Sequence, residues 1–547
     1  MNSKTSKLPI TFLRTEQLSQ WMPITLILIL ATVLRFYQLD TEGLWGDEMF
    51  SIHSARNFDP TDPGSRPLYF ALLKIWMLLG TSDTWLRTPA VLFGIGSIFL
   101  TYRLGRRLLG DSIGLIAALL VTFSPLFINH SQEIRHYTLS TFLCLGGTLA
   151  LTNVLERPTI AAIGSWGIIR VLAILTNQLN TLLLLPEILL FGWSFRKDRR
   201  RLLALGKVLL FVGTLLLMPA IYMFGGEFTK FMTSADGGAK AGVIPGFVDI
   251  VAMFTRLTTS WMLTEYIREV QVIPNTGQST TEWILQNLLG LNTFNLLYVL
   301  YYAFYTLVLI CLLGIVLIAI CKKERSEKLL LVAMSAFLPL ACIILMCHIF
   351  GPVWYRRYLV FSVPYLSILL AASFMVVWNW RQKLAILVAV FYIIAISGGL
   401  VNYYTKLHRP DWKGVAQEIS TNEKPGDVIV LYTFPRVRGL SLNRYYHGKT
   451  PIYTIDHAPK TQKLDKSWIE QQVDSLARIK SRLWLVAWNY NKYIKEPELI
   501  AETLIGKDFQ IQTEKVFASP HTSEIGTLFL ITPATTTAAK TELLPEN

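Results

Sequence analysis

The chain has 547 residues, of which 52% are apolar and 16% charged, and its mean hydropathy is +0.42. A soluble globular chain carries about 25% charged residues, so much of this chain must face something other than water. The formal net charge is +14, but the positive residues gather in short runs between apolar segments. That pattern indicates membrane topology and excludes nucleic acid as the expected partner.

The first apolar run, roughly 21–34, follows three basic residues, as the apolar core of a cleaved signal peptide also does. No small-residue cleavage motif comes after it, and Arg35, Phe36 and Tyr37 stand there instead. We therefore interpret the run as an uncleaved first membrane span.

Further spans are predicted wherever about 20 largely apolar residues follow one another. About eleven segments meet that test, namely 20–38, 88–107, 112–129, 138–155, 159–175, 178–195, 203–224, 295–320, 329–350, 358–378 and 384–404. With these spans, all runs rich in Lys and Arg fall on one side, as the positive-inside rule requires of the cytoplasmic side. The runs are 1–14, 103–107, 196–201, 322–325 and 381–383.

The apolar segment Pro67 to Gly80 is the exception, because it is only about 14 residues long and carries Lys74. Counting it as a span would place 103–107 outside, so we interpret it as an interfacial helix. The N-terminus is then cytoplasmic and the C-terminus extracytoplasmic, in a multi-pass protein of the inner or plasma membrane. Four segments face outward, and they are 39–87, 130–137, 225–294 and 351–357.

Beyond residue 405 the composition becomes mixed and polar. Short β-rich runs at 428–432, 451–455, 483–487 and 527–531 alternate with helix-like stretches near 411–421, 436–446, 466–480 and 495–506. This alternation predicts an extracytoplasmic α/β domain over 406–535 with a mostly parallel sheet. No GxGxxG follows a strand, so we expect an outer cap or acceptor-docking module, followed by a disordered tail over 536–547.

Two adjacent carboxylates, Asp47 and Glu48, come just after the first span, between Trp45 and Phe50. Partial desolvation at a bilayer surface raises the pKa of a carboxylate and suits it to proton abstraction from a hydroxyl. The alternative is an acidic pair at a helix N-terminus, where the helix dipole favours negative charge.

Several arginines lie in the outward segments, where the positive-inside rule gives no reason for them. They are Arg66, Arg135, Arg356 and Arg357, with Glu133 and Tyr137 beside Arg135. Arginine binds phosphate in a bidentate manner, so together they predict a site for an anionic lipid-linked ligand. Snorkelling at the interface and a local ion pair are the alternative.

These residues resemble the motifs of the membrane-embedded GT-C glycosyltransferases. Five motifs occur in order, and they are Asp47-Glu48, Arg66-Pro67-Leu68-Tyr69-Phe70, Leu86-Arg87 through Arg107, Ser131-Gln132-Glu133-Ile134-Arg135-His136-Tyr137, and Arg357-Tyr358-Leu359 with Asp411 to Ala416. The branch in question includes the protein O-mannosyltransferases and the aminoarabinose transferase of lipid A. The segment before Pro67 departs from the family pattern, and 225–294 matches none of it.

The resemblance implies a transmembrane glycosyltransferase domain over 1–405. It would transfer a sugar from a polyprenyl-phosphate donor to a hydroxyl or amine of an envelope glycan, lipid or protein. Asp47 would be the catalytic base, and Glu48 would support it or orient the acceptor. Arg135, with Arg66 or Arg357, would neutralise the departing lipid phosphate. No nucleotide cofactor is implied, and the residues show no clear ligand set for a divalent metal, which stays open.

Two alternatives of other kinds stay open. A lipid-linked-sugar flippase or transporter would carry charges near the bilayer midplane and on broken helices. An O-antigen ligase or polymerase would use related chemistry with diphosphate carriers.

Overall fold

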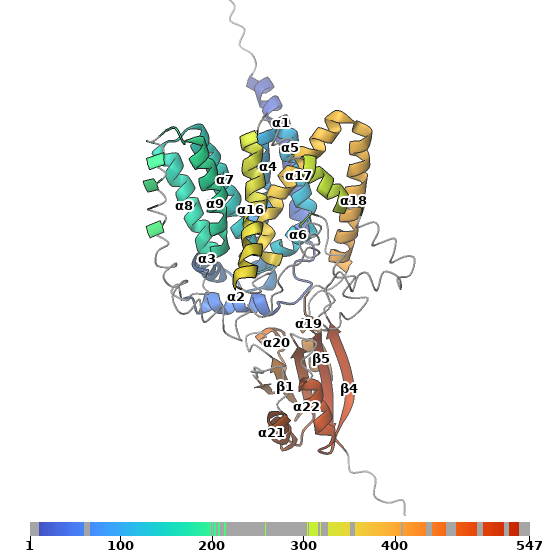
Figure 1. Ribbon diagram of the computed structural model, residues 1–547. Coiled ribbons are helices and arrows are strands. Elements are labelled where there is room, and N and C mark those ends of the chain that lie inside the picture. Colours follow the sequence, from blue (N-terminus) through green and yellow to red (C-terminus); the bar gives the residue numbers. More distant parts are fainter. Residues whose placement is uncertain are drawn as a thin grey trace, which may run out of the picture. The chain divides into compact units, whose positions relative to one another are not determined.

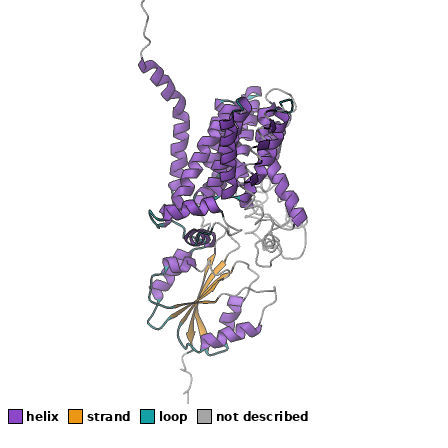
Figure 2. Ribbon diagram, turned by 90° about the vertical axis from the view of Figure 1, so that its left-hand side faces the viewer, coloured by secondary structure: helices purple, strands orange, loops and turns teal. Residues whose placement is uncertain are grey.

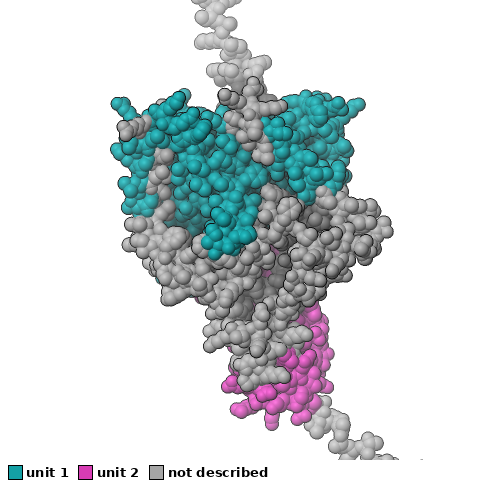
Figure 3. Space-filling view, viewed as in Figure 1, with its two compact units in different colours: residues 1–39, 54–405 teal, residues 40–53, 406–547 magenta. Residues whose placement is uncertain are grey.

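The computed structural model describes residues 10–59, 66–198, 326–350, 356–405, 409–433, 440–455, 466–489, 496–518 and 525–534, with a few residues between 200 and 318. The chain divides into two compact units, which Figure 3 colours separately. The first unit comprises residues 1–39 and 54–405, and the second comprises 40–53 and 406–547. The segment 40–53 therefore groups with the C-terminal residues and not with the helices that flank it in the chain. The segment 225–294 except for Leu257 and Thr258, the tail 536–547 and most of the predicted spans 203–224 and 295–320 lie outside the described residues.

The first unit is a bundle of helices (Figure 1). Its described helices are α1 (Ile10–Phe36), α3 (Pro67–Met77), α4 (Asp83–Leu109), α5 (Asp111–Phe123), α6 (Pro125–Ser131), α7 (Tyr137–Glu156), α8 (Ile160–Thr176), η1 (Gln178–Leu183), α9 (Leu184–Ser194), α16 (Ser326–Phe350), η3 (Arg356–Ser362), α17 (Val363–Trp380) and α18 (Gln382–Thr405). Helix α2 (Gly46–Arg56) begins in the segment 40–53.

Four helical segments in the described residues are long and apolar enough to cross a membrane. They are Tyr137–Glu156, Glu327–Ile349, Leu359–Trp380 and Gln382–Thr405. A fifth span results if α5 and α6 are counted together, although the chain bends by 66° between them. The helical unit is thus that of an integral membrane protein, while the predicted number of about eleven spans stays a prediction.

Helix α3 covers the segment that we interpret as interfacial. Its 11 residues extend roughly 16 Å, about half the thickness of a bilayer core. It lies at one end of the bundle, across the direction of the long helices (Figures 1 and 2). Its length and direction agree with the interfacial interpretation.

Helices α4 and α5 form a tight hairpin because glycines stand where they meet. Gly110, at φ +117°, makes the turn between them in the left-handed region that glycine favours. A Cβ on Gly114 would lie 2.7 Å from the Tyr102 carbonyl oxygen, and one on Gly105 would lie 2.9 Å from the Gly114 Cα. Any side chain at these positions would force the helices apart, so the glycines set the spacing of the bundle.

A buried ion pair joins helices α8 and α9 inside the first unit. Arg170 Nε donates to Glu187 Oε2 at 2.8 Å, and its Nη2 donates to Glu187 Oε1 and to Thr148 Oγ1. Its Nη1 donates to the Cys144 carbonyl oxygen at 3.0 Å, and Trp166 Nε1 donates to Glu187 Oε2 at 2.9 Å. Each guanidinium nitrogen has an acceptor, which is the condition for burying a charge without a large penalty.

The second unit contains one five-stranded sheet. Its strands are β1 (Val428–Thr433), β2 (Ile452–Ile455), β3 (Leu483–Asn489), β4 (Phe509–Ala518) and β5 (Ile525–Pro533), in the order β2-β1-β3-β5-β4. Helices α21 (Lys466–Ala477) and α22 (Glu496–Ile505) pack on one face, and α19 (Trp412–Asn422) and α20 (Leu440–Tyr445) pack on the other. Figure 2 shows this layering of helices and strands.

The sheet is mixed, whereas the sequence predicted a mostly parallel one. Strand β1 pairs in parallel with β2 and β3, but β5 is antiparallel to both β3 and β4. Strand β4 was missed because its sequence carries Glu514 and Lys515 in the middle and reads as polar. Such charges are typical of an edge strand, which they protect from pairing with other chains.

The Arg170–Glu187 pair gives a first prediction. Glu187→Ala leaves a buried guanidinium without its ionic partner, and breaking a buried pair in this way costs about 3–5 kcal/mol. We expect the thermal unfolding midpoint of the detergent-solubilised protein, followed by tryptophan fluorescence, to fall markedly. The matched control is Glu156→Ala, which removes an exposed Arg–Glu pair worth roughly 1 kcal/mol or less. Equal midpoints for the two variants would contradict the structural role of the buried pair.

Candidate functional site

The predicted loop 130–137 is formed where the chain breaks between α5 and α7. Ser124 accepts a hydrogen bond from Phe127 N at 3.3 Å and Pro125 follows it, so a short helix, α6, starts there. Residues 132–136 then connect α6 to α7. All residues from 124 to 141 are buried, so the loop lies within the unit and does not extend into solvent.

Glu133 is paired inside this loop. The Nδ2 of Asn129 donates to Glu133 Oε1 at 3.1 Å, and the Nδ1 of His130 lies 3.0 Å from Glu133 Oε2. The ring of His130 packs against Tyr137, with 4.8 Å between the ring centroids. Glu133 is thus held by Asn129 and His130, and its contact with His130 is an ion pair when the imidazole is protonated.

The loop is held between the ends of α1 and α18. The Nε2 of Gln132 donates to the carbonyl oxygens of Arg35 and Tyr37, at 2.9 Å each, and Tyr403 OH donates to Gln132 Oε1. The Nε of Arg35 donates to Ser131 Oγ at 3.2 Å. Sequence reasoning missed these positioning residues. The one signal for them was a charged residue, Arg35, at the end of an apolar span.

The positive charges of three of the predicted arginines act on one buried imidazole, that of His136. Burial lowers the pKa of His136 well below its usual range, and the positive charges of Arg66, Arg135 and Arg357 lower it further. These arginines come from the start of α3, the 132–136 loop and η3, which are far apart in the sequence. Arg135 is only 7% exposed, so it does not snorkel to a surface. The side chain of the fourth, Arg356, lies outside the described residues.

Two buried polar atoms adjoin this arginine cluster, which we define as Arg66, Arg135 and Arg357. The rings of His136 and Tyr137 pack with 4.4 Å between centroids, and Arg135 Cζ lies 5.8 Å from the Tyr137 ring centroid. Within the described part of the chain, neither His136 Nε2 nor Tyr137 OH has a hydrogen-bond partner. Buried polar atoms are nearly always hydrogen-bonded, so these two indicate a polar ligand or water beside the cluster.

The acidic pair belongs to the second unit. Asp47 and Glu48 stand in the first turn of α2, where the helix dipole favours negative charge. Asp47 is half-buried, whereas Glu48 is fully buried and accepts a hydrogen bond from Trp45 N at 3.3 Å. The two carboxylates thus lie at a helix N-terminus, as the alternative interpretation of the sequence expected, and they have different surroundings.

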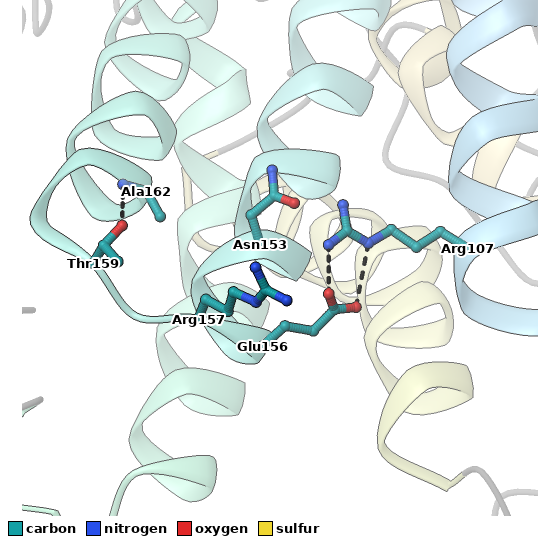
Figure 4. A pocket seen from close by; sticks show the side chains of 6 residues that line it. All are labelled: Arg107, Asn153, Glu156, Arg157, Thr159 and Ala162. Carbon is teal, nitrogen blue, oxygen red and sulfur yellow. Dashed lines mark hydrogen bonds and ion pairs between the residues drawn. The ribbon is translucent and has the colours of Figure 1, made fainter.

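A separate pocket of about 340 Å³ lies at the other end of α7 (Figure 4). It is lined by Arg107, Asn153, Glu156, Arg157, Thr159 and Ala162. Helix α7 has 20 residues and is about 30 Å long, so this pocket is remote from His136. It lies at the basic run 103–107, which we predict to be cytoplasmic, and none of the predicted site residues lines it.

Among the described residues, no group of three or more His, Cys, Asp or Glu side chains is arranged to hold a metal ion. A divalent metal therefore stays open, as in the sequence analysis.

Part of the chain matches a known protein family, and its fold matches solved structures. Residues 62–223 match the family described as dolichyl-phosphate-mannose-protein mannosyltransferase. The archaeal oligosaccharyltransferase AglB from Archaeoglobus fulgidus, in complex with an inhibitory peptide and a dolichol-phosphate, matches with 13% identity and a TM-score of 0.53, over 94% of this chain and 74% of that chain. ArnT from Cupriavidus metallidurans in the apo state matches with 13% identity and a TM-score of 0.50, over 92% of this chain and 97% of that chain.

The fold is that of the GT-C membrane glycosyltransferases. The resemblance stated from the motifs is thereby confirmed. The family match includes Arg66, Glu133, Arg135 and Tyr137, whereas Asp47, Glu48, Arg356 and Arg357 lie outside it. No protein of curated function matches the sequence.

The neutral imidazole of His136 gives a second prediction. Its pKa is lowered in the folded state, so the unfolded chain takes up a proton first as the pH falls below about 6.5. Stability is therefore lost from that pH downward until the folded pKa is reached. We expect the thermal unfolding midpoint of the wild type to fall between pH 7.5 and pH 5.5. In His136→Gln the midpoint should fall by less over the same pH range. The control is His447→Gln, at an exposed position, which should keep the full drop.

Proposed function

We propose that this protein transfers a sugar from a polyprenyl-phosphate carrier to a hydroxyl or amine acceptor at the outer face of the membrane. The observation that carries the proposal is the arginine cluster around His136, beside the Gln132-Glu133-Ile134-Arg135 loop. Two of its three members, Arg66 and Arg135, lie in the region that matches a family of lipid-phosphate-mannose transferases.

The charge of the cluster supports an anionic ligand. Cations in a largely buried place repel one another, and an anion that they share relieves this repulsion. Guanidinium groups bind phosphate oxygens through paired, charge-assisted hydrogen bonds. Because His136 stays neutral, its Nε2 adds no further positive charge there and is free to donate or accept a hydrogen bond, depending on the tautomer.

In the proposed reaction, the bond between the sugar C1 and the phosphate oxygen of the carrier breaks. A new bond forms between C1 and the acceptor oxygen or nitrogen, and the acceptor proton passes to Asp47. The carrier leaves as a lipid phosphate whose added negative charge the arginine cluster stabilises. Glu48 is buried and supports the first turn of α2, which carries Asp47, so we assign it no contact with the acceptor.

The fold is compatible with such a donor, since the AglB structure with a TM-score of 0.53 was solved with a dolichol-phosphate. That ligand is a property of AglB, and we carry it over to this chain as part of the proposal. The carrier, in our proposal, is a polyprenyl monophosphate, and the acceptor is a component of the cell envelope.

A flippase is the first alternative. The described helices contain a buried charged pair, Arg170 and Glu187, of the kind that transporters use. Here every guanidinium nitrogen is already bonded to the protein, so the pair offers no group to a passing substrate. Purified protein that moves a labelled lipid across liposomes without cleaving it would favour the flippase.

A ligase or polymerase is the second alternative, and it differs from the proposal in the carrier. Lipid monophosphate and lipid diphosphate donors compared in one transfer assay separate the two. Mass spectrometry of the lipid that co-purifies with the protein is the direct observation, because it identifies the carrier and the sugar it holds.

The base assignment predicts the effect of Asp47→Asn. The amide keeps the shape of the side chain but cannot accept the acceptor proton, so we expect transfer to be abolished. Binding of undecaprenyl phosphate, which requires only the phosphate site, should stay within about twofold of the wild type. Transfer by Asp47→Asn at the wild-type rate would remove the residue from the role of base.

The phosphate assignment predicts the effect of Arg135→Ala. Loss of one charge-assisted contact is worth roughly 1.5–3 kcal/mol, so we expect undecaprenyl phosphate to bind about 10- to 100-fold more weakly. The matched control is Arg107→Ala. Arg107 lies in the last turn of α4, at the pocket remote from His136, so this change should leave the affinity unchanged. Unchanged affinity in Arg135→Ala would exclude the residue from the phosphate site.

A further inference from the structure

The second unit contains a connection that neither the motifs nor the proposed function uses. Arg409, the first described residue after α18, is only 5% exposed. Its Nη1 donates to Glu42 Oε2 at 3.2 Å, and its Nε lies 3.9 Å from Glu48 Oε2. One guanidinium thus faces two carboxylates of the segment 40–53, and one of these belongs to the acidic motif.

Two other residues of the C-terminal part hold the same segment. Leu44 N donates to Tyr445 OH at 2.6 Å, and Lys413 Nζ donates to the Asp40 carbonyl oxygen. Gly43 packs against Tyr445 so closely that a Cβ there would lie 3.2 Å from the ring. The contacts therefore run along the segment from residue 40 to residue 48.

Arg409 and Lys413 lie on either side of a turn that is fixed to the core of the second unit. Asp411 caps α19 by accepting a hydrogen bond from Gly414 N at 2.8 Å. Trp412, which is 1% exposed, anchors the same turn in the core between α19 and the sheet. Arg409 and Lys413 flank this anchored turn, so they hold the segment from a fixed position.

The buried carboxylate of Glu48 depends on this arrangement. A fully buried charge is costly without an ionic partner, and Arg409 supplies one. The same carboxylate accepts the hydrogen bond of Trp45 N, which is one of the unsatisfied donors at the start of α2. The first turn of α2, which carries Asp47, is therefore fixed through Glu48 and Arg409.

We propose that Arg409 is a positioning residue, by which the C-terminal domain holds the acidic segment 40–53 in the conformation that presents Asp47. The proposal deepens the function above and rests on it in one respect, the role of Asp47 as base. It gives the C-terminal domain a part in catalysis that goes beyond a cap or a docking module.

The experiment compares Arg409→Met and Arg409→Lys with the wild type, in the full-length protein. The first measurement is amide hydrogen exchange of peptides covering 40–53, which needs no activity. The second is the kcat and KM of sugar transfer, together with the binding of undecaprenyl phosphate. The matched control is Arg482→Met, which removes another arginine of the second unit that pairs with a buried carboxylate, Asp427.

We expect exchange in 40–53 to rise about tenfold or more in Arg409→Met, and kcat to fall about 10- to 100-fold, because small misplacements of a catalytic group have effects of that size. Undecaprenyl phosphate should bind as in the wild type. Arg409→Lys should recover part of both losses, since it keeps the charge but not the two-carboxylate geometry. Arg482→Met should leave exchange in 40–53 unchanged.

Exchange in 40–53 that is the same in Arg409→Met and the wild type would overturn the proposal, as would a rise in exchange with unchanged kcat. An equal rise in Arg482→Met would also overturn it, because the effect would then be general loosening of the domain. Absence of transfer by the wild type would refute the proposed function instead, and the exchange measurement would still decide whether Arg409 holds the segment.

Discussion

The cost of removing a charge from water governs how this protein places its arginines. A buried guanidinium is costly unless acceptors surround it. Arg170 has a carboxylate and two further oxygens, and Arg35 donates to Ser131 and to the carbonyl oxygens of Val121 and Thr122. Arg170 ties together α7, α8 and α9, which follow one another in the chain, whereas Arg35 ties α1 to the distant helices α5 and α6. The polar contacts thus determine which helix ends meet, while the apolar surface drives the helices into a bundle.

The arginine cluster differs from these arginines in what lies beside it. Its three members lower the pKa of one buried imidazole, and two buried polar atoms beside it, His136 Nε2 and Tyr137 OH, have no hydrogen-bond partner among the described residues. Positive charge beside polar atoms with unused hydrogen-bonding capacity is what a preorganised anion site requires. In the proposed function, Arg135 is therefore a ligand-binding residue, whereas Arg170 is a structural one, although both are buried.

Periodicity and motif order predicted much of this from the sequence alone. The apolar runs around α7, α16, α17 and α18 were located within a few residues, because a membrane span is a local property of composition. Strand β4 was missed, since an edge strand with charges lacks the apolar pattern of a buried one. The ties from Arg35 and Tyr403 to the 132–136 loop, and from Arg409 to Glu42 and Glu48, were missed for another reason. They join residues about 95 to 370 positions apart, and no pattern within a single segment encodes them.

The acidic pair shows how two adjacent carboxylates come to differ. Successive residues of a helix point about 100° apart, so the first turn of α2 directs Glu48 inward and leaves Asp47 half-exposed. Glu48 accepts a hydrogen bond from Trp45 N and lies near Arg409, whereas Asp47 stays partly exposed. Divergent surroundings of neighbouring titratable groups are the usual basis for dividing roles between them. In the proposed function, the motif thus combines one reactive carboxylate, Asp47, with one structural carboxylate, Glu48, which links the first turn of α2 to Arg409.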